Sequence, residues 1–201
     1  MEKTCTHYKR RCHLVTPCCD KVYCCRFCHN DSEQHELDRS KVEELVCSQC
    51  SHRQPLGTHC EECSILFGMY SCLECRLFDD TDKKQFHCDQ CGFCRVGGRE
   101  NFIHCNNCGI CMDKAVIGTH NCRSESGKDV CPVCFESVHT SPGSVFVPKC
   151  GHLIHFDCVA MINKYQYLAR CPLCRLVYND GPVHGNNNTH VIDIVGDGNE
   201  S

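Results

Sequence analysis

The sequence predicts a row of small metal-stabilised modules, irregular in fold with short α and β elements, instead of one domain around an apolar core. The chain has 201 residues, of which 26 are cysteine and 14 are histidine. Leu, Ile, Val and Phe together make up only about 22% of it, close to the level below which too little apolar surface is buried for folding. This composition excludes an enzyme fold built on a large aliphatic core, so cross-links have to hold the chain together.

The spacing of the cysteines favours zinc over disulfides as the cross-link. They occur mostly as CxxC pairs with histidines among them, and zinc takes cysteine sulfur and histidine nitrogen in sets of four, whereas a disulfide framework needs no histidine. The first seven residues, Met1–His7, contain no apolar segment of the kind that a secretory signal peptide has. No apolar run approaches the length of a membrane span. We therefore expect a zinc protein of a reducing compartment, the cytoplasm or the nucleus, with no membrane partner.

The most regular spacing lies between residues 131 and 174. Eight cysteines and histidines follow the pattern C-x2-C-x15-C-x-H-x2-H-x2-C-x12-C-x2-C. Two interleaved sites use all eight: Cys131, Cys134, His155 and Cys158 form one, and Cys150, His152, Cys171 and Cys174 form the other. A zinc ion with four protein ligands has no open position for water, so these sites are expected to be structural. Apolar residues at i, i+3 spacing predict a short helix from about Asp157.

An internal repeat lies before this segment. His87-Cys88-x-x-Cys91-x-x-Cys94 recurs seventeen residues later as His104-Cys105-x-x-Cys108-x-x-Cys111, and each copy carries a glycine, Gly92 or Gly109, after its third ligand. Such a repeat predicts small zinc-bound units that follow one another and share ligands.

Three blocks of the chain resemble known zinc fingers. Cys5-Thr6-His7-Tyr8 opens a block that resembles the CHY zinc finger, the repeat lies in a block that resembles the CTCHY zinc finger, and residues 131–174 resemble a cross-brace RING finger with two central histidines. In this order they are typical of the RING finger and CHY zinc finger ubiquitin ligase family, and the resemblance runs from Cys5 to Arg175. The C-terminal zinc ribbon usual in that family has no counterpart, because no cysteine follows Cys174.

The resemblance also implies a ligand set. With the RING it amounts to 32 ligands, enough for eight zinc ions. The CHY ligands are Cys5, His7, Cys18, Cys19, Cys25, Cys28, His29, His35, Cys47, Cys50, Cys60 and Cys63. The CTCHY ligands are Cys72, Cys75, His87, Cys88, Cys91, Cys94, His104, Cys105, Cys108, Cys111, His120 and Cys122.

Two cysteines and six histidines stay outside this ligand set. Cys12 and Cys24 are interpreted as structural thiols, with Cys24 as an alternative ligand beside Cys25, in preference to a thiol that accepts ubiquitin. The remaining histidines are interpreted as surface or loop residues: His13, His52, His59, His139, His184 and His190.

The implied function is that of a RING-type ubiquitin-protein ligase. Such a ligase docks a ubiquitin-conjugating enzyme and promotes ubiquitin transfer to a substrate lysine, without a covalent ubiquitin intermediate on itself and without a catalytic residue of its own. The docking residues carried over are Val133, Pro172 and Leu173, and Arg175 matches the basic residue that bridges the conjugating enzyme and ubiquitin. The N-terminal modules are expected to recruit protein substrates, transcription regulators among them, for ubiquitin-dependent degradation.

The alternative functions are a non-catalytic protein-interaction scaffold and a nucleic-acid binder. The formal charge is −4, and the densest basic run, Lys9-Arg10-Arg11, is three residues long. Because nucleic-acid binding needs clustered lysine and arginine, no direct nucleic-acid partner is expected. The scaffold stays open as the alternative.

The predicted boundaries follow the blocks. The CHY finger is placed at residues 1–66, the CTCHY finger at 67–124, a short polar linker at 125–130 and the RING at 131–175. A disordered tail is placed at 176–201, apart from the short apolar segment Val191-Ile192-Asp193-Ile194-Val195.

Overall fold

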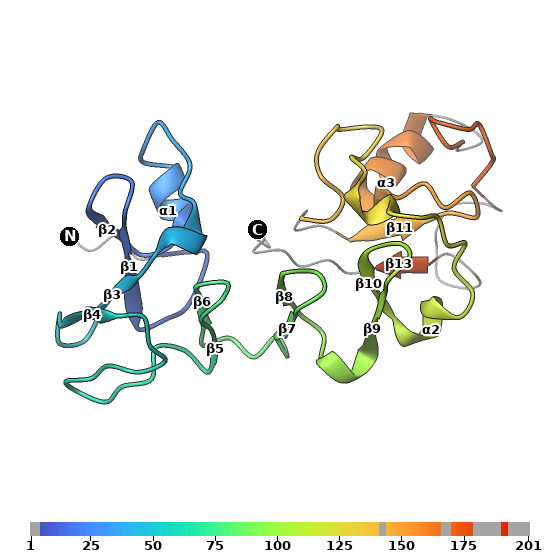
Figure 1. The fold of residues 1–201 in the computed structure, drawn as a ribbon. Helices are drawn as coiled ribbons and strands as arrows, with labels where there is room; N and C mark the ends of the chain where they lie inside the picture. The colour runs from blue at the N-terminus through green and yellow to red at the C-terminus, as the bar shows by residue number, and fades with distance from the viewer. Residues whose placement is uncertain (1–4, 141–143, 166–169, 179–189, 193–201) are drawn as a thin grey trace. The chain divides into compact units, whose positions relative to one another are not determined.

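The computed structural model describes residues 5–140, 144–165, 170–178 and 190–192. The chain divides into two compact units, unit 1 at Met1–Lys83 and unit 2 at Lys84–Ser201, and Figure 1 traces their elements. The elements are short: the longest of the described helices, α3, has ten residues, and none of them is long and apolar enough to cross a membrane. The predicted fold class, small irregular metal-stabilised modules, is confirmed.

Unit 1 is built on a four-stranded antiparallel sheet. The strands are β1 (Cys12–Thr16), β2 (Lys21–Tyr23), β3 (Glu44–Cys47) and β4 (Arg53–Pro55), in the order β2-β1-β3-β4. Helix α1 (Arg26–Asn30) and a 3₁₀ turn, Arg39–Lys41, lie between β2 and β3. A separate hairpin, β5 (Tyr70–Cys72) with β6 (Leu77–Asp79), closes the unit.

A small apolar core joins the sheet of unit 1 to its hairpin. Leu14 and Leu45 oppose one another across β1 and β3, and both are almost fully buried. Phe67 and Phe78 are fully buried and meet edge to face, with ring centroids 6.1 Å apart. Cys12 and Cys47 belong to the same cluster, so the few apolar side chains pack directly against thiols.

Unit 2 begins with two hairpins that carry the sequence repeat. Strands β7 (Phe86–Cys88) and β8 (Phe93–Arg95) form the first, and β9 (Phe102–Cys105) and β10 (Ile110–Asp113) form the second. A 3₁₀ turn, Arg99–Asn101, connects them, and helix α2 (Lys114–Ile117) follows β10. Phe86, directly before His87, packs against Phe102, two residues before His104, with ring centroids 5.6 Å apart. We call these two hairpins the first and second zinc knuckles.

The rest of unit 2 is a sheet with one helix. Strands β11 (Val145–Val147), β12 (Ile154–His155) and β13 (His190–Ile192) are ordered β12-β11-β13, and α3 (Phe156–Tyr165) follows β12 directly. The helix expected from about Asp157 is therefore present. Val159 is buried as a core residue, and Phe156 is half-buried.

Two segments differ from what the sequence predicts. Within the predicted disordered tail, Tyr178 is buried against Phe146 at 5.4 Å between ring centroids, and β13 pairs with β11. Val191 and Ile192 begin the short apolar segment that stands apart from this polar tail, and β11 supplies their pairing partner. Residues 179–189 and 193–201 lie outside the described part. In the predicted linker, Ser126–Lys128 forms a 3₁₀ turn whose Ser126 and Gly127 are buried.

Candidate metal centres

Four side chains of unit 1 converge at the start of α1. Cys5, His7, Cys25 and Cys28 bring their sulfurs and the His7 Nδ1 together, and all six pairwise distances lie between 3.5 and 3.9 Å. Zinc–sulfur bonds of about 2.3 Å at tetrahedral angles place two sulfurs roughly 3.8 Å apart, whereas bonded disulfide sulfurs are about 2.05 Å apart. These are the edge lengths of a zinc tetrahedron.

Local structure explains why Cys25 and Cys28 meet. Cys25 is the N-cap of α1, and its sulfur accepts a hydrogen bond from the Cys28 backbone N–H. One turn of helix then returns the Cys28 side chain to the same point. The CxxC spacing therefore doubles as a helix cap, since a cap side chain normally satisfies an N–H of the first turn.

A second group in unit 1 shows how a histidine is prepared for a metal. Cys18, Cys19, His29 and His35 lie together, with the Cys18 sulfur 3.2 Å from the Nε2 of the fully buried His29. The Asn30 Oδ1 accepts from the Leu37 N–H and lies 3.0 Å from the His29 Nδ1. Nδ1 must then carry the proton, which leaves the Nε2 lone pair facing the thiols.

The third group of unit 1, Cys47, Cys50, Cys60 and Cys63, has four cysteines. The sulfurs of Cys47 and Cys63 are 3.7 Å apart, and those of Cys50 and Cys60 are 3.5 Å apart. Each CxxC closes with a turn in which the N–H of the fifth residue, Ser51 or Ser64, donates to the carbonyl of the first cysteine. The CHY ligands implied by the resemblance thus gather in three sets.

The first knuckle of unit 2 contributes to a group with the second. Cys88, Cys91, His104 and Cys111 converge, and the five measured edges run from 3.2 to 3.8 Å. The fully buried Arg95 places its Nη2 3.5 Å from the Cys91 sulfur. The hydrogen bond from Cys111 and the charge of Arg95 lower the pKa of Cys91 to about 3. The pair of hairpins therefore shares one site, as the repeat predicts.

The second knuckle and the segment after α2 form another group. The sulfurs of Cys105 and Cys108 lie 3.5 and 3.4 Å from the His120 Nε2 and 3.6 and 3.3 Å from the Cys122 sulfur. The His120 Nδ1 lies 2.7 Å from the Ile117 carbonyl oxygen, so it carries the proton and leaves Nε2 for a metal.

The remaining four ligands of the middle block lie in hairpins. Cys72 and Cys75 flank the turn after β5, where the Cys75 N–H donates to the Cys72 sulfur. His87 and Cys94 face each other across β7 and β8, 3.8 Å from Nδ1 to sulfur. The role of these four residues, and the CTCHY assignment of the block, stay predictions.

The eight ligands predicted by spacing at 131–174 gather as two sets. The Cys134 sulfur lies 3.2 Å from the His155 Nδ1, and Cys158 interacts with Cys131 and Cys134. The Cys171 sulfur lies 3.6 Å from the His152 Nδ1, and Cys150 interacts with Cys171 and Cys174. The sets interleave along the chain, as a cross-brace requires.

The loops of this cross-brace carry exposed apolar side chains. Val133 is half-buried, whereas Leu173 is 60% exposed and Pro172 and Arg175 are exposed. Sequence reasoning missed Phe135, which directly follows the second ligand and is 74% exposed. Its position after a CxxC was the available signal, because it matches that of Arg175 after the last CxxC.

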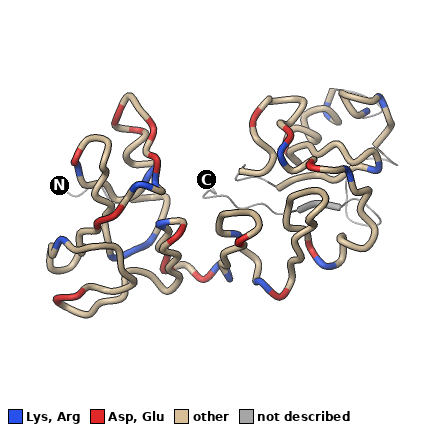
Figure 2. The backbone as a smooth tube through the Cα atoms, in the orientation of Figure 1, with Lys and Arg blue, Asp and Glu red and all other residues tan. Residues whose placement is uncertain are grey.

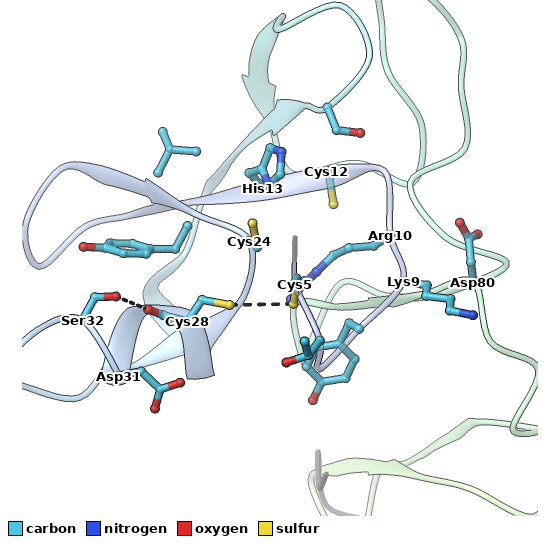
Figure 3. A pocket seen from close by; sticks show the side chains of 15 residues that line it. Cys5, Lys9, Arg10, Cys12, His13, Cys24, Cys28, Asp31, Ser32 and Asp80 are labelled. Carbon is cyan, nitrogen blue, oxygen red and sulfur yellow. Dashed lines mark hydrogen bonds between the residues drawn. The ribbon is translucent and has the colours of Figure 1, made fainter. Parts of the chain in front are cut away.

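The two cysteines outside the ligand set line one hollow of unit 1, of about 1230 Å³ (Figure 3). Cys12 is fully buried, and burial raises the pKa of its thiol to about 12. A thiol that stays protonated at neutral pH is a poor nucleophile, which favours the structural interpretation. Cys24 is half-buried beside His13 in the same hollow.

Comparisons with known proteins find zinc fingers in both units of the chain. Residues 5–70 match the CHY zinc finger and residues 129–175 match the Ring finger domain. The chain is 43% identical to the E3 ubiquitin-protein ligase SRFP1 of Oryza sativa subsp. japonica, over 86% of this chain and 67% of the relative. The chain belongs to the CHY and RING zinc finger family of E3 ubiquitin-protein ligases. It therefore binds zinc through its Cys/His clusters; the number of eight ions stays a prediction.

Other members of this family differ in length. The E3 ubiquitin-protein ligase RZFP34 of Arabidopsis thaliana is 40% identical over 85% of this chain, which spans 62% of that relative. Zinc finger protein BRUTUS of the same plant is 36% identical over 90% of this chain, which spans 14% of that relative. The CHY and RING fingers thus occur together in proteins of very different size.

Proposed function

We propose that this chain is a RING-type ubiquitin ligase that docks a charged ubiquitin-conjugating enzyme on the two loops of its cross-brace. One combined observation supports the proposal. Two four-ligand sets fix the loops of the cross-brace, and the same loops expose apolar side chains. With four protein ligands in each set, a bound zinc ion would keep no open position for water. Leu173 is 60% exposed and Phe135 is 74% exposed. Such side chains are typical anchors of a protein interface.

The residues act by position. Zinc, when bound, supplies the folding energy of the loops. Val133, Pro172 and Leu173 supply the apolar contact with the conjugating enzyme, and the exposed guanidinium of Arg175 offers donors to the enzyme and to ubiquitin together. The substrate lysine amine attacks the thioester carbonyl, a C–N bond forms, the C–S bond breaks, and the conjugating enzyme's cysteine leaves as thiolate. The ligase holds the conjugate in a reactive geometry for this step.

Further parts of the proposal concern partners and place. The N-terminal zinc modules recruit protein substrates, the transfer leads to ubiquitin-dependent degradation, and the chain acts in the cytoplasm or the nucleus. Transcription regulators are the substrate class to test first. Figure 2 shows lysine and arginine interspersed with aspartate and glutamate along both units, which supports protein partners over a phosphate backbone.

The test is reconstitution with activating enzyme, a panel of conjugating enzymes, ubiquitin and ATP. Val133→Ala should lower discharge of the charged conjugating enzyme about tenfold, equivalent to about 1.4 kcal/mol, with an unchanged zinc content. Ile103→Ala, which truncates a 40% exposed apolar residue of β9, is the matched control and should keep full activity. Absence of ubiquitin transfer with every conjugating enzyme would favour the non-catalytic scaffold.

A further inference from the structure

The two knuckles of the repeat offer the same backbone atom to the rest of unit 2. In each knuckle the N–H of the glycine donates to the carbonyl of the first cysteine, Gly92 to Cys88 and Gly109 to Cys105, both at 2.8 Å. The third ligands, Cys91 and Cys108, come directly before these glycines, and each has a backbone carbonyl at the same place in its turn. These two carbonyls are equivalent, seventeen residues apart.

Each of these carbonyls is bound by a residue outside the repeat. The Gly127 N–H donates to the Cys108 carbonyl at 2.8 Å. The His139 Nε2 lies 3.1 Å from the Cys91 carbonyl oxygen, so Nε2 carries the proton and donates. The His139 ring also meets Phe93 edge to face at 4.7 Å between centroids. His139 is a loop residue, as expected, but it is half-buried and bonded.

Close packing leaves no room for a side chain at this contact. A Cβ on Gly127 would lie 2.8 Å from the Cys108 carbonyl oxygen and 3.0 Å from that of Gly109. Both neighbours are backbone atoms, which cannot rotate away as a side chain can. Just before this contact in both segments, the Glu125 N–H donates to the Asn107 carbonyl at 2.6 Å. Residues 125–128 are thus bound along the second knuckle (Figure 1).

We propose that the two zinc knuckles fix the orientation of the RING through the equivalent carbonyls of Cys91 and Cys108. We call the surface formed by these two carbonyls the seat of the RING. Gly127 and His139 are the positioning residues of this seat: the first holds the segment entering the RING, and the second holds the RING's own loop after Cys134. Two hydrogen bonds, one to each copy of the repeat, prevent a rotation of the RING that a single hydrogen bond would allow. The consequence for ubiquitin transfer rests on the function proposed above.

The test compares matched glycine variants of the full zinc-loaded chain by hydrogen exchange. Gly127→Ala adds a methyl group where backbone atoms crowd, whereas Gly118→Ala adds one where nothing lies within 4 Å. Gly127→Ala should speed amide exchange in residues 124–130 at least tenfold, with a zinc content equal to that of the wild type by native mass spectrometry. Gly118→Ala should leave amide exchange in residues 124–130 unchanged. Unchanged exchange in Gly127→Ala would overturn the seat.

A second pair of variants tests the other bond. His139→Leu removes the donor to the Cys91 carbonyl and should also speed exchange at 124–130, because both bonds hold one seat. His139→Gln keeps a donor and should restore at least half of the lost protection. If His139→Leu leaves exchange at 124–130 as in the wild type, the two carbonyls do not act together and the proposal is wrong.

Transfer assays separate positioning from stability. In both Gly127→Ala and His139→Leu, discharge to free lysine, which needs only the docked conjugate, should stay within twofold of the wild type. Self-ubiquitination, which needs a lysine of the chain presented to that conjugate, should fall at least fivefold. Faster exchange with both activities unchanged would overturn the positioning role. A wild-type chain without any discharge would refute the proposed function, while the exchange experiment would still decide the seat.

Discussion

The knuckles of the repeat and the loops of the RING share one backbone turn but fill it with different residues. Gly92 and Gly109 close the knuckles with φ of 75° and 72°, and Phe135 and Arg175 close the RING loops with φ of 62° and 65°. In all four, the N–H donates to the carbonyl of the first cysteine of the CxxC. A side chain at such a φ costs about 1 kcal/mol relative to glycine.

The difference lies in whether the residue that closes the turn carries a side chain. A Cβ at Gly92 or Gly109 would meet nothing within 4 Å, so space does not forbid a larger residue in the knuckles. The RING accepts the less favourable residue twice, and Phe135 and Arg175 are both exposed. Ser51 and Ser64 close the CxxC turns of unit 1 at positive φ as well, so it is the exposure of Phe135 and Arg175, and not the turn, that supports the proposed docking role.

The largest expected effect comes from removing one ligand of the RING. Cys131→Ser should abolish discharge of the conjugating enzyme and lower the zinc content by at least one ion, because each structural site contributes on the order of 10 kcal/mol to folding. Native mass spectrometry and the discharge assay measure the two losses. Cys24→Ser is the control and should keep the zinc content of the wild type; loss of an ion there would make Cys24 a ligand.

An exchange of residue types between the two regions gives the next largest effect. Arg175→Gly should lower discharge about tenfold, or about 1.4 kcal/mol, and raise the free energy of unfolding by about 1 kcal/mol. Gly92→Ala should do the reverse: activity within twofold, and stability lower by about 1 kcal/mol. Denaturation and single-turnover discharge measure both. A loss of stability in Arg175→Gly would mean that the arginine serves the turn itself.

Truncation of the other RING side chain should have a smaller effect. Phe135→Ala keeps the φ requirement but removes most of an exposed ring, so affinity for the conjugating enzyme should fall about threefold to fivefold, without loss of stability. Calorimetry or fluorescence polarisation measures it. An affinity equal to that of the wild type would place Phe135 outside the docking surface.

The smallest effect is expected in unit 1, away from both turns. Hydrogen bonds from Lys21 and Tyr23 lower the pKa of the Glu33 carboxyl below its ordinary value of 4.5. A depressed pKa stabilises the fold above 4.5, and this contribution is lost as the pH falls through the lowered value. Glu33→Gln should therefore flatten the acid side of the stability curve slightly and leave discharge at neutral pH unchanged. Thermal unfolding between pH 3 and 7 tests this, and equal slopes would exclude the ion pair as a contributor.

The two ligand sets at 131–174 could be predicted from the sequence because zinc imposes its ligand spacing locally. A CxxC turn brings two sulfurs together without help from the rest of the chain, and a count of four per ion limits the ways to combine the turns. The grouping of Cys131 and Cys134 with His155 and Cys158, interleaved with a second set of four, could therefore be predicted from spacing. The short helix after His155 could be predicted from its apolar period.

Other features depended on partners far along the chain. The sequence does not show that the Cys91 carbonyl lies beside His139. It also does not show that Phe146 packs against Tyr178 in the predicted tail. Gly127 looks like an ordinary linker glycine, and only the approach of the Cys108 backbone makes its missing Cβ necessary.

By itself the sequence predicted that metal, and not an apolar core, organises this chain, and the spacing at 131–174 predicted the eight ligands of the cross-brace. The reason is that ligand type and spacing are local properties. The tertiary structure alone decided that residues 125–128 bind along a zinc knuckle, and that two RING turns keep exposed side chains at positive φ. Those properties follow from backbone atoms meeting across the fold and from the exposure of each side chain, and no residue spacing encodes either.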